Sequence, residues 1–237
     1  MRATTIIAMT VLLGAGTVMG HGFLSKPPSR NYLHNSNYCP HCLNAGGTSQ
    51  TKGSHYPRSR HGMCGDPASG PRPHEAGGTF ATGKVTGYYR QGGRIVVTTS
   101  IATYHRGVIE YRVCRYRAGS AASERRALTE SCLNEHVLRQ ASGGGGRYQY
   151  LGNRPETGYN PPKPYTATYR LPDDLVCDGK TWKCVLQMHW ITGNTCSPAF
   201  LPKKYRVRGL GECGGARGLW PEEFWNCADI VVLPKKH

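Results

Sequence analysis

The sequence predicts an all-β fold, an immunoglobulin/fibronectin-like β-sandwich with long disulfide-stapled loops and a short helix. Short segments rich in Val, Ile, Thr and Tyr recur along the chain and are bounded by Gly, Pro or Asp, which is the pattern of β-strands. The ten cysteines are an even number, as a framework of up to five disulfides requires. The 31 glycines and 16 prolines assign much of the remaining chain to loops. Several short strands with such loops are typical of a sandwich.

The amino-terminal segment 1–20 has the features of a signal peptide. A basic residue precedes an apolar stretch, and Val18 and Gly20 stand at the −3 and −1 positions of a cleavage site. The apolar stretch is too short to be a membrane span. We therefore expect a secreted, extracellular protein with no membrane association, in which 21–237 forms one domain and His21 is the new amino terminus.

The elements follow in order along the predicted mature chain. From 21 to 84 the sequence is rich in Gly, Pro, Ser, Asn and His without a periodic apolar pattern, which predicts a long loop held by disulfides of Cys39, Cys42 and Cys64. We expect a helix over 123–138 and a glycine-rich tip at 142–146. The strands are predicted at 94–99 with 101–104, 108–116, 165–171, 182–191, 204–207 and 228–233.

The chain is strongly basic, with a formal net charge of +16, or +15 once Arg2 is removed with the leader. Such a charge attracts polyanions. Nucleic acid is an unexpected partner for an exported, disulfide-bonded chain with no basic helix or ribonucleoprotein-type strand. An acidic polysaccharide or an anionic cell wall fits better, unless the charge serves solubility alone. Export likewise favours a structural disulfide over a redox or zinc site for the C-x-x-C of Cys39 and Cys42.

An amino-terminal histidine is suited to copper. The free amine of His21, with an ordinary pKa of about 7.7–8.0, and its ring Nδ1 would offer two nitrogens from one residue. A third nitrogen from a distant histidine would complete a T-shaped site. His105 is a candidate because it ends a predicted strand, with Gly107 allowing the turn into the next. The alternative is that the histidine after the leader is incidental.

Several motifs, spread in order over nearly the whole mature chain, together resemble one family. They are HGFLSKPPSR from His21, CGDP from Cys64, GPRPHEAGG from Gly70, HRG from His105, TESCLNEHVL from Thr129, CVLQ from Cys184, GN from Gly193 and CADI from Cys227. In these motifs the chain resembles the lytic polysaccharide monooxygenases and is most similar to auxiliary-activity family fifteen.

The resemblance implies a histidine brace. His21, through its amine and Nδ1, and His105, through a ring nitrogen, would hold one copper ion, and Phe224 would stand at the axial position without a ligand oxygen. The implied reaction uses an external electron donor, either a small molecule or a protein, together with hydrogen peroxide or dioxygen. It hydroxylates a C–H bond beside a glycosidic link of chitin or cellulose, after which the link breaks.

Other residues are candidates for supporting roles. The two-residue period of a strand puts Gln187 and His189 on one face, where they either hydrogen-bond the oxidant or face solvent. Aromatic rings pack against sugar rings, so Tyr32, Tyr38 and Tyr56 are candidate substrate contacts. The loop histidines are candidates for a secondary metal site or a substrate contact, or else face solvent: His34, His41, His55, His61 and His74.

Alternative functions remain open at this point. The same chemistry on an acidic glycan such as pectin suits the charge better than chitin, which is itself partly cationic. A non-catalytic secreted copper- or glycan-binding protein would use the same brace, and a basic structural or antimicrobial protein would need none of it. We expect the protein to act as a monomer.

Overall fold

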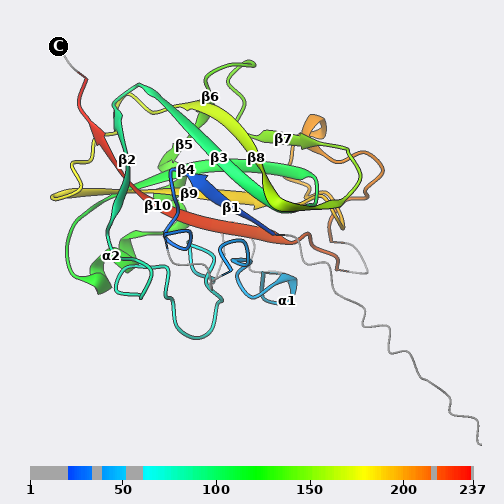
Figure 1. The fold of residues 1–237 in the computed structure, drawn as a ribbon, viewed down its shortest axis with the longest axis horizontal. Coiled ribbons are helices and arrows are strands. Elements are labelled where there is room, and N and C mark those ends of the chain that lie inside the picture. Colours follow the sequence, from blue (N-terminus) through cyan, green and yellow to red (C-terminus); the bar gives the residue numbers. More distant parts are fainter. Residues whose placement is uncertain (1–20, 34–38, 52–60, 215–217, 236–237) are drawn as a thin grey trace, which may run out of the picture.

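Two packed β-sheets form the protein in the computed structural model, which describes residues 21–33, 39–51, 61–214 and 218–235 (Figure 1). One sheet has the order β1-β3-β8-β6, formed by His21–Lys26, Arg94–Tyr104, Thr157–Arg170 and Arg139–Gln140. The other has the order β2-β10-β9-β4-β5 with β7 beside β4, formed by Val85–Arg90, Glu223–Leu233, Trp182–Ile191, Gly107–Arg117, His136–Val137 and Gln149–Gly152. The predicted β-sandwich is confirmed.

The main core lies between the two sheets. Aliphatic side chains of β3 such as Ile95, Val97 and Ile101 are fully buried against the inner face of the larger sheet. Burying one such side chain contributes about 1.5–3 kcal/mol. At one end this core becomes aromatic, because Trp190 of β9 and Phe224 of β10 are both buried there.

The outer face of the larger sheet is also covered. Met63 and Cys64 of the long loop, with Leu133 of a short helix, pack on Val185 of β9 and Cys227 of β10. Figure 1 shows the cyan loop, α1 (Thr48–Thr51) and α2 (Ala121–Ala127) on this side of the sheet. Because both faces are covered, β4, β9 and β10 are buried along almost their whole length instead of at alternate positions.

All ten cysteines are paired, as the even count predicts. The five pairs are Cys39–Cys42, Cys64–Cys227, Cys114–Cys132, Cys177–Cys184 and Cys196–Cys213. The C-x-x-C motif therefore closes its own four-residue turn. Of the five disulfides, Cys64–Cys227 is the one that attaches the long loop to β10.

Some strand predictions are wrong in detail. The segment from 21 to 84 is not all loop, because β1 pairs with β3 along its whole length. The two segments 94–99 and 101–104 form the single strand β3. A strand at 204–207 is absent, since Lys203–Tyr205 form a 3-10 turn after Pro202 in which Arg206 N–H donates to the Lys203 carbonyl.

The helix predicted over 123–138 is two short helices. The first, α2, ends at Leu128, whose backbone is extended, and Thr129 caps α3 (Glu130–Glu135) by accepting a hydrogen bond from Cys132 N–H. The disulfide from Cys132 to Cys114 of β4 fixes α3 against the sheet. His136 then starts strand β5 instead of continuing the helix.

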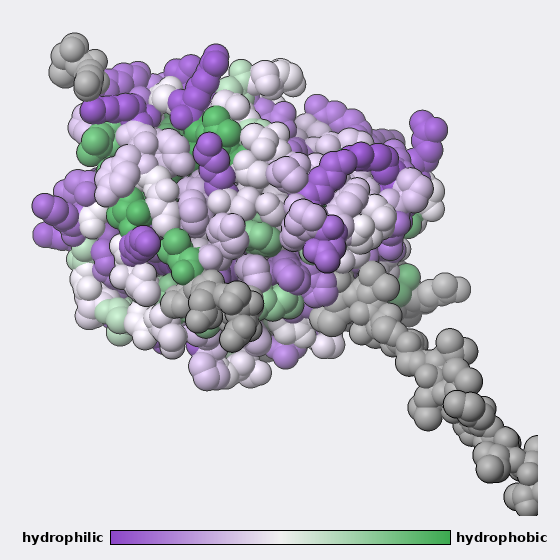
Figure 2. Space-filling model, in the orientation of Figure 1, coloured by the Kyte–Doolittle hydropathy of each residue, from purple (hydrophilic) through white to green (hydrophobic). Residues whose placement is uncertain are grey.

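The exposed apolar side chains of the described residues are scattered over the surface. Figure 2 shows a face on which hydrophilic and neutral side chains surround small separate hydrophobic areas. Exposed large apolar side chains belong to different elements: Tyr32, Tyr88, Val96, Phe200 and Leu219. Among the described residues, no helix is long and apolar enough to cross a membrane.

Candidate metal centre

The pairing of β1 with β3 brings His21 and His105 to the same end of the smaller sheet. His21 is the first residue of β1 and lies opposite Thr103 of β3. His105 follows two residues later, immediately after β3 ends. Two histidines 84 positions apart in the sequence therefore lie at the same end of this sheet.

A tight turn fixes the backbone at His105. Arg106 and Gly107 have positive φ angles of 54° and 84°, and Gly193 N–H donates to the His105 carbonyl at 2.7 Å. A Cβ atom on Gly107 would lie 2.1 Å from the Ile191 carbonyl oxygen. Glycine is therefore required for both conformation and space, and the turn is seated firmly on the end of β9.

Aromatic rings lie beneath the two histidines. The Phe224 ring is 6.5 Å from the His21 ring and 5.3 Å from the Trp190 ring, measured between centroids. Trp190 Nε1–H donates to the Arg106 carbonyl at 2.9 Å, which ties this ring to the turn after His105. Gly22 makes room, since a Cβ there would lie 2.8 Å from the Trp190 ring.

His105 is buried, with 2% of its surface exposed, yet neither ring nitrogen has a hydrogen-bond partner among the described residues. Two carboxylates stand nearby, Glu156 at 3.3 Å from Nδ1 and Glu222 at 3.9 Å from Nε2, without hydrogen-bond geometry. Buried polar atoms are normally paired, so this pair of orphaned nitrogens indicates a missing partner. Imidazole nitrogens suit copper, and the residues present therefore fit a copper ion.

A third imidazole lies beside His21. The His41 ring stands edge-on to the His21 ring with centroids 4.8 Å apart. One ligand atom each of His21, His41 and Cys42 fall within 4.8 Å of one another. The Cys42 sulfur belongs to the Cys39–Cys42 disulfide and is no thiolate ligand, so only the two imidazoles count. Burial lowers the pKa of His41, which favours its neutral ring.

Gln187 and His189 do not join this group. In the register of β9 and β10, Phe224 is opposite Trp190 while Trp225 is opposite His189, so Gln187 and His189 face the outer side of the sheet. The alternative prediction, that Gln187 and His189 face solvent, is also wrong, because the long loop covers both side chains. Gln187 accepts hydrogen bonds from Arg112 at 3.0 and 2.6 Å and donates to the Met63 carbonyl at 2.6 Å.

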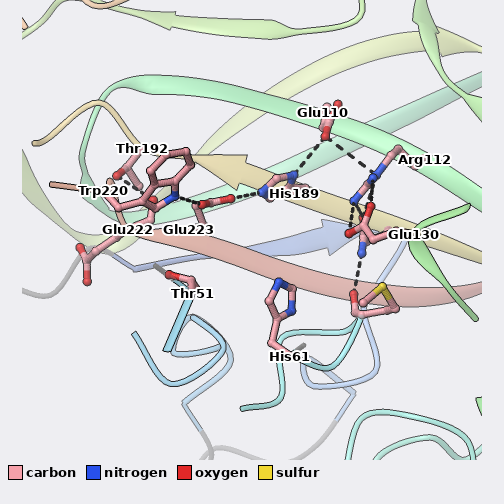
Figure 3. Close-up of polar contacts among 12 residues, drawn as sticks. Thr51, His61, Glu110, Arg112, Glu130, His189, Thr192, Trp220, Glu222 and Glu223 are labelled. Carbon is pink, nitrogen blue, oxygen red and sulfur yellow. Dashed lines mark hydrogen bonds and ion pairs between the residues drawn. The ribbon is translucent and has the colours of Figure 1, made fainter. Parts of the chain in front are cut away.

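His189 lies between two carboxylates. Nδ1 is 3.0 Å from Glu110 and Nε2 is 2.5 Å from Glu223. Figure 3 shows these residues in one row of hydrogen bonds and ion pairs that runs from Trp220 to Glu130. Burial alone lowers the pKa of His189, but the hydrogen bonds to both carboxylates outweigh it and raise this pKa. An imidazolium is the form that donates from both nitrogens.

The candidate tyrosines and histidines of the long loop differ in their surroundings. Tyr32 is 44% exposed and packs on Phe23 with ring centroids 4.8 Å apart, while Tyr38 and Tyr56 lie outside the described residues, as do His34 and His55. The prediction of solvent exposure is wrong for His61 and His74, because both are buried. His61 packs against Trp225, and His74 contacts Asp66.

The carboxylates beside His105 were not predicted. Glu156 belongs to the segment before β8 and Glu222 to the segment before β10, and no sequence pattern links either of them to a histidine so distant in the chain.

Comparisons with known proteins show the family of the chain. The chain matches the sequence family described as lytic polysaccharide mono-oxygenase, cellulose-degrading, over residues 21–230. It is similar to the solved structure of a lytic polysaccharide monooxygenase of auxiliary-activity family fifteen from Thermobia domestica in the Cu(I) state. The TM-score is 0.67 and the identity 28%, over 90% of this chain and 99% of the other. Among curated proteins, none matches the chain.

Proposed function

The chain belongs to the lytic polysaccharide monooxygenases, and from this premise we propose that it is a secreted copper enzyme that oxidatively cleaves chitin or cellulose. Residues 21–237 would form its single catalytic domain after removal of 1–20. The observation that carries the proposal is the buried His105, at the same sheet end as His21, whose two ring nitrogens have no hydrogen-bond partner among the described residues.

The proposed ligands are His21 and His105. Once the leader is removed, His21 would present its amine and its ring to the ion, and His105 would add one ring nitrogen. When bound, copper would supply one-electron redox chemistry that uses an external reductant with hydrogen peroxide or dioxygen. Family membership implies this ion, a reductant and a polysaccharide substrate.

The surrounding residues would position these ligands. The turn at Gly107 holds the His105 backbone, and Trp190 supports that turn through its indole N–H. Phe224 is 1% exposed and carries no hydroxyl, so it would provide apolar surroundings and no ligand oxygen. Apolar surroundings of this kind limit access of water to a metal centre.

An exposed aromatic ring supports a polysaccharide as substrate. Tyr32 packs on Phe23, which lies two residues from His21 on β1, so an exposed ring stands near the proposed ion. Such rings stack on the apolar faces of sugars. The family description names cellulose, which is compatible with a neutral, aromatic-bound polymer.

The direct test is mass spectrometry of soluble products. Copper-loaded protein beginning at His21 is incubated with ascorbate and, separately, chitin, cellulose and polygalacturonate. Oxidised oligosaccharides from chitin or cellulose are expected. If no polymer yields them although copper is bound, the protein is instead a non-catalytic copper- or glycan-binding protein.

An acidic glycan is the second candidate substrate, and a basic hollow on the surface favours it. The hollow, of about 400 Å³, lies between the glycine-rich tip and the 3-10 turn. Arg139 and Lys204 line it and form no ion pair with a described residue, while Tyr205 and the 46% exposed Phe200 supply rings. No acidic residue lines it.

Salt dependence separates the two candidates. Attraction to a uronan should weaken strongly between 0.1 M and 1 M salt, because the Debye length falls from about 10 Å to about 3 Å. The double variant Arg139→Gln/Lys204→Gln should lose the salt-sensitive part of binding to polygalacturonate and keep binding to cellulose. Binding to all three polymers that is independent of salt would remove the acidic glycan from consideration.

A further inference from the structure

We propose that His41 supplies a third imidazole to the copper ion held by His21 and His105, an inference that rests on the proposed function. The Cys39-Pro-His-Cys42 motif would then be a metal-site motif of an unusual kind. Its cysteines would form the disulfide that closes the turn, and the histidine between them would be the ligand.

The distance between the imidazoles is close to what one ion requires. A ligand nitrogen of His41 lies within 4.8 Å of one of His21. Two imidazole nitrogens bound to one first-row metal, each at about 2.0–2.1 Å as on zinc, are at most about 4 Å apart. A shift of roughly 1 Å closes the difference. The two rings meet edge to face, with centroids 4.8 Å apart, so that the two imidazoles are close neighbours.

The turn that carries His41 is held in several ways. The disulfide closes it, and Cys42 N–H donates to the Cys39 carbonyl at 3.3 Å. Pro40 restricts the backbone, and its carbonyl accepts a hydrogen bond from the side chain of Asn31, which is 1% exposed. An ordered turn lowers the entropy loss when the imidazole binds.

The His41 ring has no competing use among the described residues. It forms ring contacts with His21 and Phe23 but no hydrogen bond or ion pair with a described residue. His61 and His74 of the same long loop differ, because His61 Nδ1 contacts the Gly62 carbonyl and His74 Nδ1 contacts Asp66. Of the described histidines in this loop, His41 is therefore the one available to an ion.

The test counts imidazoles on bound Cu(II) by pulsed electron paramagnetic resonance and measures copper affinity by competition with a chelator. Wild-type protein beginning at His21 should show three imidazoles, and His41→Gln should show two. The affinity of the variant should fall by at least about tenfold, the low end for residues around a metal. His136→Gln is the matched control, since His136 is half-buried on β5, 3.7 Å from Asp174.

The outcomes separate this inference from the proposed function. Wild-type protein with two imidazoles, and His41→Gln with the same count and affinity, would overturn the role of His41 and leave the brace intact. Wild-type protein that binds no copper would overturn both.

A second variant tests the turn. Cys39→Ser/Cys42→Ser keeps His41 but removes the disulfide that closes its turn, so the copper affinity of this variant should lie between those of wild type and His41→Gln. An unchanged far-ultraviolet circular dichroism spectrum is the evidence of folding. Wild-type affinity in this folded double variant would contradict the assigned role of the motif.

Discussion

His105, which follows β3 of the smaller sheet, and His189, within β9 of the larger sheet, are both buried, yet their surroundings are opposite. His105 is 2% exposed and both of its ring nitrogens lack hydrogen bonds within the described structure. His189 is 5% exposed and both of its nitrogens contact carboxylates. Both histidines are buried to a similar extent. The presence or absence of hydrogen bonds to the ring nitrogens therefore distinguishes a candidate ligand from a structural residue.

The comparison extends to the two faces of β10. Phe224 faces the inner side and is close to His21, whereas its neighbour Trp225 faces outward and stacks on His189 at 4.9 Å. The inner face therefore lies next to the proposed copper site, and the outer face supports an ionic network that attaches the long loop. One strand separates the proposed chemistry from the stabilising contacts.

The largest expected effect is on copper binding. Replacing His105 with Ala should weaken copper affinity by more than about 100-fold, the upper end for residues that merely support a metal ligand. The melting temperature of the metal-free protein should fall only through lost packing of the buried ring, because the His105 nitrogens form no hydrogen bond with a described residue. Copper titration with calorimetry checks the first part, and a thermal melt the second. A strongly destabilised variant with unchanged copper affinity would show that His105 is a structural residue and not a copper ligand.

The next effect is on stability. Glu223→Gln removes one charge of a buried ion pair and should lower the free energy of unfolding by about 3–5 kcal/mol. Urea denaturation at pH 6 measures it. Glu212→Gln is the control, since its pair with Arg206 at 2.8 Å is on the surface and should contribute less than about 1 kcal/mol. Equal losses in both variants would refute the special role of the outer network.

A smaller effect is expected at Gly22. An added Cβ would overlap the Trp190 ring at 2.8 Å, so Gly22→Ala should cost about 1–3 kcal/mol by overpacking. Gly211→Ala is the matched control, because no atom lies within 4 Å of its Cβ position. Denaturation curves of the two variants measure the difference in the free energy of unfolding. Coincident curves would show that β1 shifts away from Trp190 at no cost in stability.

The smallest effect is a pH dependence of stability. The pKa of His189 is raised in the folded protein, so its contribution is complete below its unfolded pKa of about 6.5 and is lost as the pH rises through the folded value. Burial raises the pKa of Glu110, but Arg112 and His189 outweigh it and lower this pKa, so its contribution is lost in acid instead.

The measurement is the free energy of unfolding of wild type and His189→Gln between pH 5 and 9. Above about pH 6.5 the wild-type curve should fall more steeply than that of the variant. Parallel curves in this range would mean that His189 is neutral in the folded protein.

Local patterns in the sequence predict the strands with apolar and β-branched residues, such as β4 and β9. The proposed metal pair, His21 and His105, follows from a motif resemblance. β1 escaped prediction because its six residues, HGFLSK, are stabilised by pairing with β3 and not by a periodic pattern of their own. The outward face of Gln187 and His189 was likewise unpredictable, since alternation assigns residues to two faces without saying which one is covered by a distant loop. The proximity of His41 to His21 could not be predicted from the sequence either, because it depends on the three-dimensional position of the turn that carries His41.

The central claim is that the amine of His21 and the ring of His105 hold copper together. The most direct test is a copper titration of two matched proteins, one beginning at His21 and one retaining a Gly ahead of it. The account predicts tight one-to-one binding by the first and much weaker binding by the second, because a peptide nitrogen replaces the amine. Equally tight one-to-one binding by the extended protein would contradict the brace.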